Sequence, residues 1–130
     1  MQQSKVVLVV EDDPDIRFIL EDFLTGEGYK VVSKAKGREA LVYLAENKPD
    51  LILLDMKLPD ISGNDILQSL PSKALTIPVM VVSANTAQLV STPQVKAVVS
   101  KPFDLLELLS TIEDCIRISE LVEVAPPQFA

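Results

Sequence analysis

The sequence contains no histidine and only one cysteine among its 130 residues. The lack of histidine excludes imidazole metal ligands, a serine–histidine–aspartate triad and a phosphohistidine carrier. Any bound metal would need oxygen ligands, which favours a hard cation such as Mg2+. Because Cys115 has no second cysteine to pair with, an internal disulfide is excluded, and we expect a reducing, cytoplasmic compartment.

Long apolar runs and positive charges are also scarce. No apolar run approaches the roughly 20 residues that a membrane helix needs. The formal net charge is −7, and an acidic surface repels nucleic-acid phosphates and anionic lipid headgroups. We therefore expect no direct nucleic-acid partner and no membrane partner. With 48% hydrophobic and 24% charged residues, the composition is typical of one globular domain with a substantial core.

Short apolar runs alternate with amphipathic stretches along the chain. Val6–Val10 has five apolar residues, four of them β-branched, and predicts a strand buried on both faces. The same patterns predict further strands and helices. We expect the strands at Tyr29–Ser33, Leu51–Leu54, Pro78–Val82 and Lys96–Ser100, and the helices at Pro14–Gly26, Arg38–Asn47, Asn64–Leu70 and Asp104–Ser119.

This alternation predicts an α/β fold with a doubly wound, five-stranded parallel sheet in the flavodoxin-like order 2-1-3-4-5. The interval Asn85–Val95 contains Pro93 and little periodicity, so we expect a shortened or irregular fourth helix there, or a loop. We assign residues 1–119 to the domain. Residues 120–130 include two prolines and predict a flexible tail or the start of a linker.

Chemically distinctive residues follow four of the five predicted strands. Glu11, Asp12 and Asp13 follow the first strand, Asp55 the third, Ser83 the fourth and Lys101 the fifth. In parallel sheets of this kind, ligands gather beyond the carboxyl ends of the strands. Clustered carboxylates need a cation to remain ionised together, which Mg2+ would supply. A carboxylate can act as a nucleophile toward phosphorus, while an ammonium and a hydroxyl stabilise phosphoryl oxygens.

Each residue also has a plainer interpretation. The acidic residues 11–13 could cap the helix that follows them, and Asp55 could be a turn residue. Ser83 could be a helix cap, and Lys101 a solvated loop lysine. Their joint placement at four strand ends favours a single site.

Two segments, residues 9–17 (VVEDDPDIR) and 54–63 (LDMKLPDISG), closely resemble the response-regulator receiver family of two-component signalling. Residues 83–84 and 101–103 complete the match, which runs from about residue 5 to 119. The resemblance implies that Asp55 is the phosphoacceptor.

For the metal, the resemblance implies that Mg2+ is held by Glu11, Asp12, Asp55 and the backbone carbonyl of Lys57. Asp12 would be a direct ligand and Glu11 would act largely through water.

The resemblance also implies a switch hydroxyl at Ser83, a phosphate-contacting Lys101 and a cis bond to Pro102. Lys57 and Asn85 would tune loss of the phosphoryl group.

By the same resemblance, a histidine kinase or histidine phosphotransfer protein donates the phosphoryl group in a phosphorelay. The domain is then a switch that catalyses only its own phosphorylation and dephosphorylation. Its active form controls an output partner, which is either a separate protein or a second receiver in a homodimer. Two departures affect the family's readout surface. Val98 stands where the family often has an aromatic residue, and the interval from Ser83 to Lys101 is short.

Two alternatives remain open from the sequence. One is a receiver-like binding module that does not use phosphorylation, which the two departures favour. The other is a haloacid-dehalogenase-like phosphatase with an aspartyl-phosphate intermediate. Such enzymes usually place a second aspartate two residues after the nucleophile, where this chain has Lys57.

Overall fold

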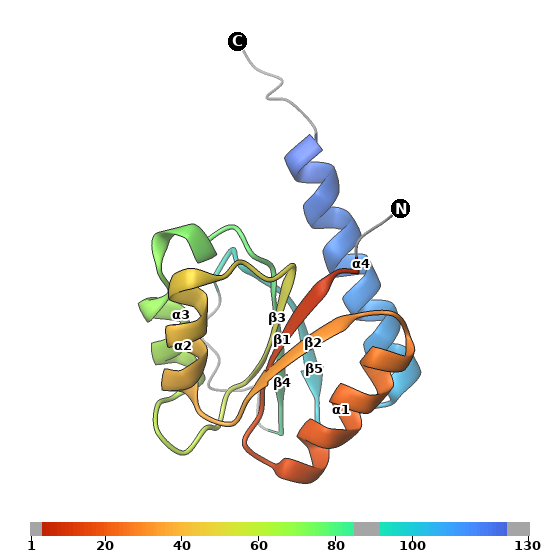
Figure 1. Cartoon of the computed structure of the whole chain (residues 1–130), viewed down its shortest axis with the longest axis horizontal. Helices are drawn as coiled ribbons and strands as arrows, with labels where there is room; N and C mark the ends of the chain where they lie inside the picture. Colours follow the sequence, from red (N-terminus) through yellow and green to blue (C-terminus); the bar gives the residue numbers. More distant parts are fainter. Residues whose placement is uncertain (1–3, 85–91, 125–130) are drawn as a thin grey trace.

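A computed structural model describes residues 4–84 and 92–124, and its strands form one five-stranded parallel sheet (Figure 1). Its order is β2-β1-β3-β4-β5, which confirms the predicted topology. The strands are β1 (Val6–Val10), β2 (Lys30–Lys34), β3 (Leu51–Asp55), β4 (Val79–Ser83) and β5 (Val95–Ser100).

Helices cover both faces of the sheet (Figure 1). Helices α1 (Pro14–Gly26) and α4 (Leu105–Val124) pack on one face. Helices α2 (Gly37–Glu46) and α3 (Gly63–Ser69), with the short 3-10 helix η1 (Ser72–Ala74), pack on the other. Within residues 4–84 and 92–124, no helix is long and apolar enough to cross a membrane.

Successive strand residues enter two separate hydrophobic cores. Val9 and Leu53 point into the core under α1 and α4, whereas Val10 and Leu54 point into the core under α2 and α3. This follows from the pleat of a strand, which sends neighbouring side chains to opposite faces. Every residue of β3 and β4 is buried, so the side chains at the ends of these strands stand on a firmly packed base.

The structure differs from the sequence predictions mainly around the last helix. The helix end predicted at Ser119 is wrong, because α4 continues to Val124. No proline or glycine occurs between Pro102 and Pro126, so nothing in the sequence forces the helix to stop earlier. The division into a domain and a tail stays a prediction. The expected fourth helix falls largely on residues 85–91, which lie outside the described part of the chain.

Gly63 marks a close approach between the start of α3 and the loop that follows β3. Its amide donates to the Met56 carbonyl oxygen at 2.9 Å. A Cβ at this position would lie 2.7 Å from the Met56 Cα and would also meet the Met56 Sδ. Because the obstacle is backbone, a side chain here would have to displace the loop that begins at Asp55.

We predict that Gly63→Ala lowers the free energy of unfolding by about 2 kcal/mol, since overpacking against fixed backbone is costly. Gly26→Ala is the matched control, because a Cβ there meets nothing within 4 Å, and it should gain about 0.5 kcal/mol. Urea unfolding followed by circular dichroism measures both values. Equal stability of the two variants would contradict the prediction.

Candidate functional site

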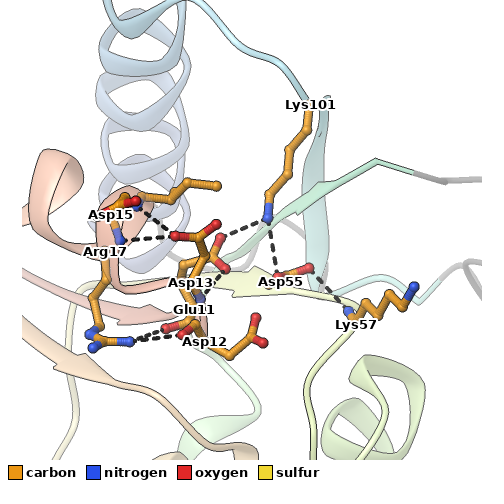
Figure 2. Close-up of polar contacts among 9 residues, drawn as sticks. Glu11, Asp12, Asp13, Asp15, Arg17, Asp55, Lys57 and Lys101 are labelled. Carbon is orange, nitrogen blue, oxygen red and sulfur yellow. Dashed lines mark hydrogen bonds and ion pairs between the residues drawn. The ribbon is translucent and has the colours of Figure 1, made fainter.

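Four loops meet at the carboxyl edge of the sheet and bring the predicted side chains together. Glu11, Asp12 and Asp55 each offer a carboxylate oxygen, and these oxygens lie within 4.8 Å of one another. The Lys101 ammonium reaches two of these three carboxylates (Figure 2). The four residues come from the ends of β1, β3 and β5. In the sheet order β1 lies beside β3, and β4 lies between β3 and β5.

Lys101 bridges two buried carboxylates. Its Nζ lies 2.8 Å from Glu11 Oε1 and 3.2 Å from Asp55 Oδ2. Burial alone would lower the pKa of this ammonium. The hydrogen bond to Glu11 and the charges of Asp55 and Glu11 outweigh burial, so the Lys101 pKa is raised above its ordinary value of 10.5. Lys101 therefore stays protonated at neutral pH and neutralises part of the acidic site.

Glu11 is 1% exposed, and both of its carboxylate oxygens have partners. Oε1 accepts from Lys101, and Oε2 accepts from the Asp13 amide at 3.1 Å. Burial raises the Glu11 pKa above its ordinary value of 4.5, with a further contribution from the Asp55 charge. The Lys101 and Asp13 donors act in the opposite direction but do not cancel the rise. Glu11 is thus held in place by its own hydrogen bonds.

Asp55 ends β3 and is 4% exposed. Its Oδ1 accepts from the Lys57 amide at 3.0 Å, and its Oδ2 accepts from Lys101. The bond to Lys57 is the local turn that the plainer interpretation of Asp55 anticipated, but the bond to Lys101 joins residues 46 positions apart. Asp55 is therefore part of the assembled site as well as of a turn.

The acidic run after β1 divides between two roles. Asp13 caps α1, since its Oδ1 accepts from the amides of Asp15 at 2.9 Å and Ile16 at 3.3 Å. The capping interpretation therefore holds for Asp13. Asp12, by contrast, is exposed, and its carboxylate accepts no hydrogen bond from any residue that the structure describes.

Ser83 and Lys57 lie next to the carboxylate cluster. Ser83 is 4% exposed at the end of β4, and its carbonyl accepts from the Lys101 amide at 2.9 Å. Both residues line an open cavity of about 950 Å3 together with Glu11, Asp12 and Asp55. The plainer interpretation of Ser83, a helix cap, concerns residues outside the described part of the chain.

The predicted cis bond between Lys101 and Pro102 is confirmed. Asn85, a predicted tuning position, lies outside the described residues.

Two further residues of the site were missed from the sequence. Asp60 accepts from the amides of Gly37 and Arg38, both at 2.9 Å, and so caps α2 from the loop after β3. Desolvation would raise the Asp60 pKa, but these two donors lower it more, so it lies below its ordinary value of 3.8. Lys36, the residue before α2, makes no capping side-chain hydrogen bond. This was the one indication that a residue elsewhere in the chain must cap the helix. The other missed residue is Arg17, which contacts the loop after β1.

Comparison with known proteins agrees with this geometry. A family model described as the response regulator receiver domain matches residues 7–113. The chain belongs to this family. It is a receiver domain of the two-component response regulators, which are signalling switches.

Individual relatives extend the match. The receiver domain is 40% identical over 119 residues to the transcriptional regulatory protein KdpE of Mycobacterium tuberculosis, covering 86% of this chain and 51% of KdpE. The chain thus spans about half the length of that relative.

Among solved structures, the receiver domain resembles a CheY-like response regulator receiver protein from Methanospirillum hungatei. The TM-score is 0.80 at 25% identity, covering 91% of this chain and 98% of that one. It also resembles the response regulator TrrA of Thermotoga maritima, with a TM-score of 0.77 at 29% identity, covering 85% and 98%.

The crowded carboxylates predict that Asp12→Asn stabilises the receiver domain in EDTA. Removing one of three charges within 4.8 Å should raise the free energy of unfolding by about 1 kcal/mol. Asp15→Asn is the control, because Asp15 lies in the first turn of α1, where a negative charge is favourable. Chemical denaturation of both variants in EDTA measures the effect. A loss of stability in Asp12→Asn would contradict the prediction.

The raised Lys101 pKa predicts a specific alkaline loss of stability in EDTA. Lys101→Met should cost about 3 kcal/mol at pH 7, because it leaves buried carboxylates without their cation. A raised pKa means that this contribution is fully present below 10.5 and disappears as the pH rises through the folded-state pKa. The stability difference between wild type and variant should therefore shrink above pH 10.5.

Unfolding curves from pH 7 to 11.5 test this alkaline behaviour. Lys73→Met, at an exposed position, is the matched control. Its difference in unfolding free energy from wild type should be small and should not shrink above pH 10.5. A wild-type advantage over Lys101→Met that stays constant to the highest pH would contradict the role assigned to Lys101.

Proposed function

We propose that this receiver domain accepts a phosphoryl group on Asp55 from a phosphohistidine of a histidine kinase or phosphotransfer protein, in a Mg2+-dependent reaction, and so changes conformation to control a partner. The observation that carries the proposal is the Lys101 ammonium, held 3.2 Å from the Asp55 carboxylate within a cluster of acidic oxygens. A cation beside the nucleophile and a group of oxygen ligands are the two requirements of phosphoryl transfer to a carboxylate.

The oxygen donors in the cluster fit Mg2+. The carboxylates of Asp12 and Asp55 would bind the ion together with the Lys57 backbone carbonyl. Glu11 would act through water, because both of its oxygens already accept hydrogen bonds from Lys101 and Asp13. The bound ion would neutralise charge on the phosphoryl oxygens. The TrrA structure, described as a complex with Mg2+ and BeF, supports this metal.

The residues of the chain have separate tasks in the proposed transfer. An Asp55 carboxylate oxygen attacks the phosphorus atom, forming an acyl phosphate. The phosphorus–nitrogen bond of the donor breaks, and its electron pair stays on the imidazole nitrogen. The Lys57 amide holds the other Asp55 oxygen, which orients the nucleophile. Lys101 compensates the charge of the phosphoryl group.

The switch would begin at the same contacts. A phosphoryl group on Asp55 adds negative charge next to Lys101 and competes with Glu11 for the ammonium. The buried Ser83 hydroxyl would donate to a phosphoryl oxygen. Because Ser83 ends β4 and Lys101 directly follows β5, both movements would displace the loops after these strands. Inverting a 1:99 population in this way would require about 5.5 kcal/mol.

The net charge of the domain indicates the class of its output partner. At a net charge of −7, we propose a protein partner or a second copy of the domain rather than direct contact with nucleic acid. We also propose a cytoplasmic location, which suits the single, buried and free Cys115.

One observation favours a second candidate, a binding module that does not use phosphorylation. Val98 is 45% exposed on β5 and carries no aromatic ring to report a change at Lys101. The assembled cluster argues against this candidate, because a module that bound constitutively would have no need of three crowded carboxylates and a partly buried lysine paired with two of them.

Incubation with acetyl phosphate and Mg2+, followed by mass spectrometry, tests the proposed function. Wild type should gain one phosphoryl group, and none should appear without Mg2+ or in Asp55→Asn. Asp15→Asn should react as wild type does, because Asp15 lies outside the acidic cluster. Phosphorylation that persists in Asp55→Asn would contradict the proposal. No reaction of wild type, with no NMR shifts near Asp12 and Asp55 on adding Mg2+, would favour the binding module.

A further inference from the structure

Arg17 of α1 reaches back to the main chain of the loop after β1. Its Nη1 donates to the carbonyl oxygen of Glu11 at 2.9 Å and to that of Asp12 at 3.2 Å (Figure 2). Among the described residues, Arg17 forms no ion pair with a carboxylate, although Glu11–Asp13 supplies three in the same loop. The guanidinium is therefore used to hold backbone.

The two carbonyls have a defined relation to Asp12. The Glu11 carbonyl belongs to the peptide group before the Asp12 Cα, and the Asp12 carbonyl belongs to the peptide group after it. One guanidinium nitrogen thus fixes both peptide groups that flank this Cα. The backbone dihedrals of a residue determine which side-chain rotamers it can adopt.

Asp12 has particular need of such support. The Glu11 and Asp55 carboxylates each accept two hydrogen bonds, from Lys101 and from a backbone amide. The exposed Asp12 carboxylate accepts none from the described residues, so its direction is set through its own main chain.

We propose that Arg17 is a positioning residue for the metal ligand Asp12. By fixing the peptide groups on either side of the Asp12 Cα, Arg17 directs the Asp12 carboxylate toward the oxygens of Glu11 and Asp55. The inference rests on the proposed function, because it assumes that the cluster binds Mg2+.

Electrostatics alone predicts the opposite effect of removing Arg17. A positive charge beside the site repels a divalent cation, so its loss would strengthen Mg2+ binding. If Arg17 positions a ligand, its loss weakens Mg2+ binding instead, as removal of groups that orient metal ligands generally does. The direction of the change in affinity therefore separates the two roles.

The test is a Mg2+ titration of the 130-residue chain by isothermal titration calorimetry, with wild type, Arg17→Met and Arg17→Lys. We expect Arg17→Met to bind Mg2+ roughly tenfold more weakly. Arg17→Lys should lie between wild type and Arg17→Met, because an ammonium can still donate to a carbonyl. The control is Arg117→Met, which makes the same charge change at an exposed arginine paired with Asp114, and it should bind as wild type does.

A second readout separates positioning from general damage to the fold. The rate of phosphorylation by acetyl phosphate in Arg17→Met should return close to the wild-type rate at saturating Mg2+, so that only the half-saturating Mg2+ concentration rises. If Arg17→Met fails to fold, the comparison of Arg17→Lys with wild type decides in the same way.

Equal or tighter Mg2+ binding in the Arg17 variants, with wild type binding normally, would overturn this inference and leave the proposed function intact. A wild-type chain that does not bind Mg2+ would overturn both.

Discussion

The Lys101 ammonium, placed between two buried carboxylates, constrains the whole carboxyl edge of the sheet. Its partners lie 90 and 46 positions away in the sequence, Glu11 directly after β1 and Asp55 at the end of β3. A buried carboxylate is costly unless it is paired and hydrogen-bonded. Glu11 and Asp55 meet this requirement only if β1, β3 and β5 end at the same edge and at the same height.

The same contact accounts for the division of labour among the acidic residues. Glu11 and Asp55 are inside, and the lysine and nearby amides hold them still. Asp12 is outside, without a partner among the described residues, and is the carboxylate most open to solvent. A site with two anchored acids and one accessible acid can admit a cation from solvent without first breaking a hydrogen bond at the entrance.

Much of this arrangement could be predicted from the sequence, because the apolar runs that indicate strands are followed directly by the polar residues that indicate the site. The apolar run Val6–Val10 gave the bounds of β1, and the residues that follow the strands became the members of the cluster. The acidic run alone could not separate the capping role of Asp13 from the role of Asp12, since adjacent aspartates have the same composition signal. Only the family resemblance, which omits Asp13 from the implied Mg2+ ligands, distinguished them. The contact of Asp60 with the start of α2 was missed because its partners lie 22 and 23 positions away.

The two hydrophobic cores have a mechanical consequence at the edge where they meet. The chain after Asp55 enters the core under α2 and α3 through Met56, whereas the chain after Lys101 enters the opposite core through Phe103. The sheet separates these cores, yet the ion pair between Lys101 and Asp55 joins the two segments just before each one enters its own core. An event that separates Lys101 from Asp55 therefore removes a contact shared by the segments that enter the two cores, and so acts on both layers of the molecule.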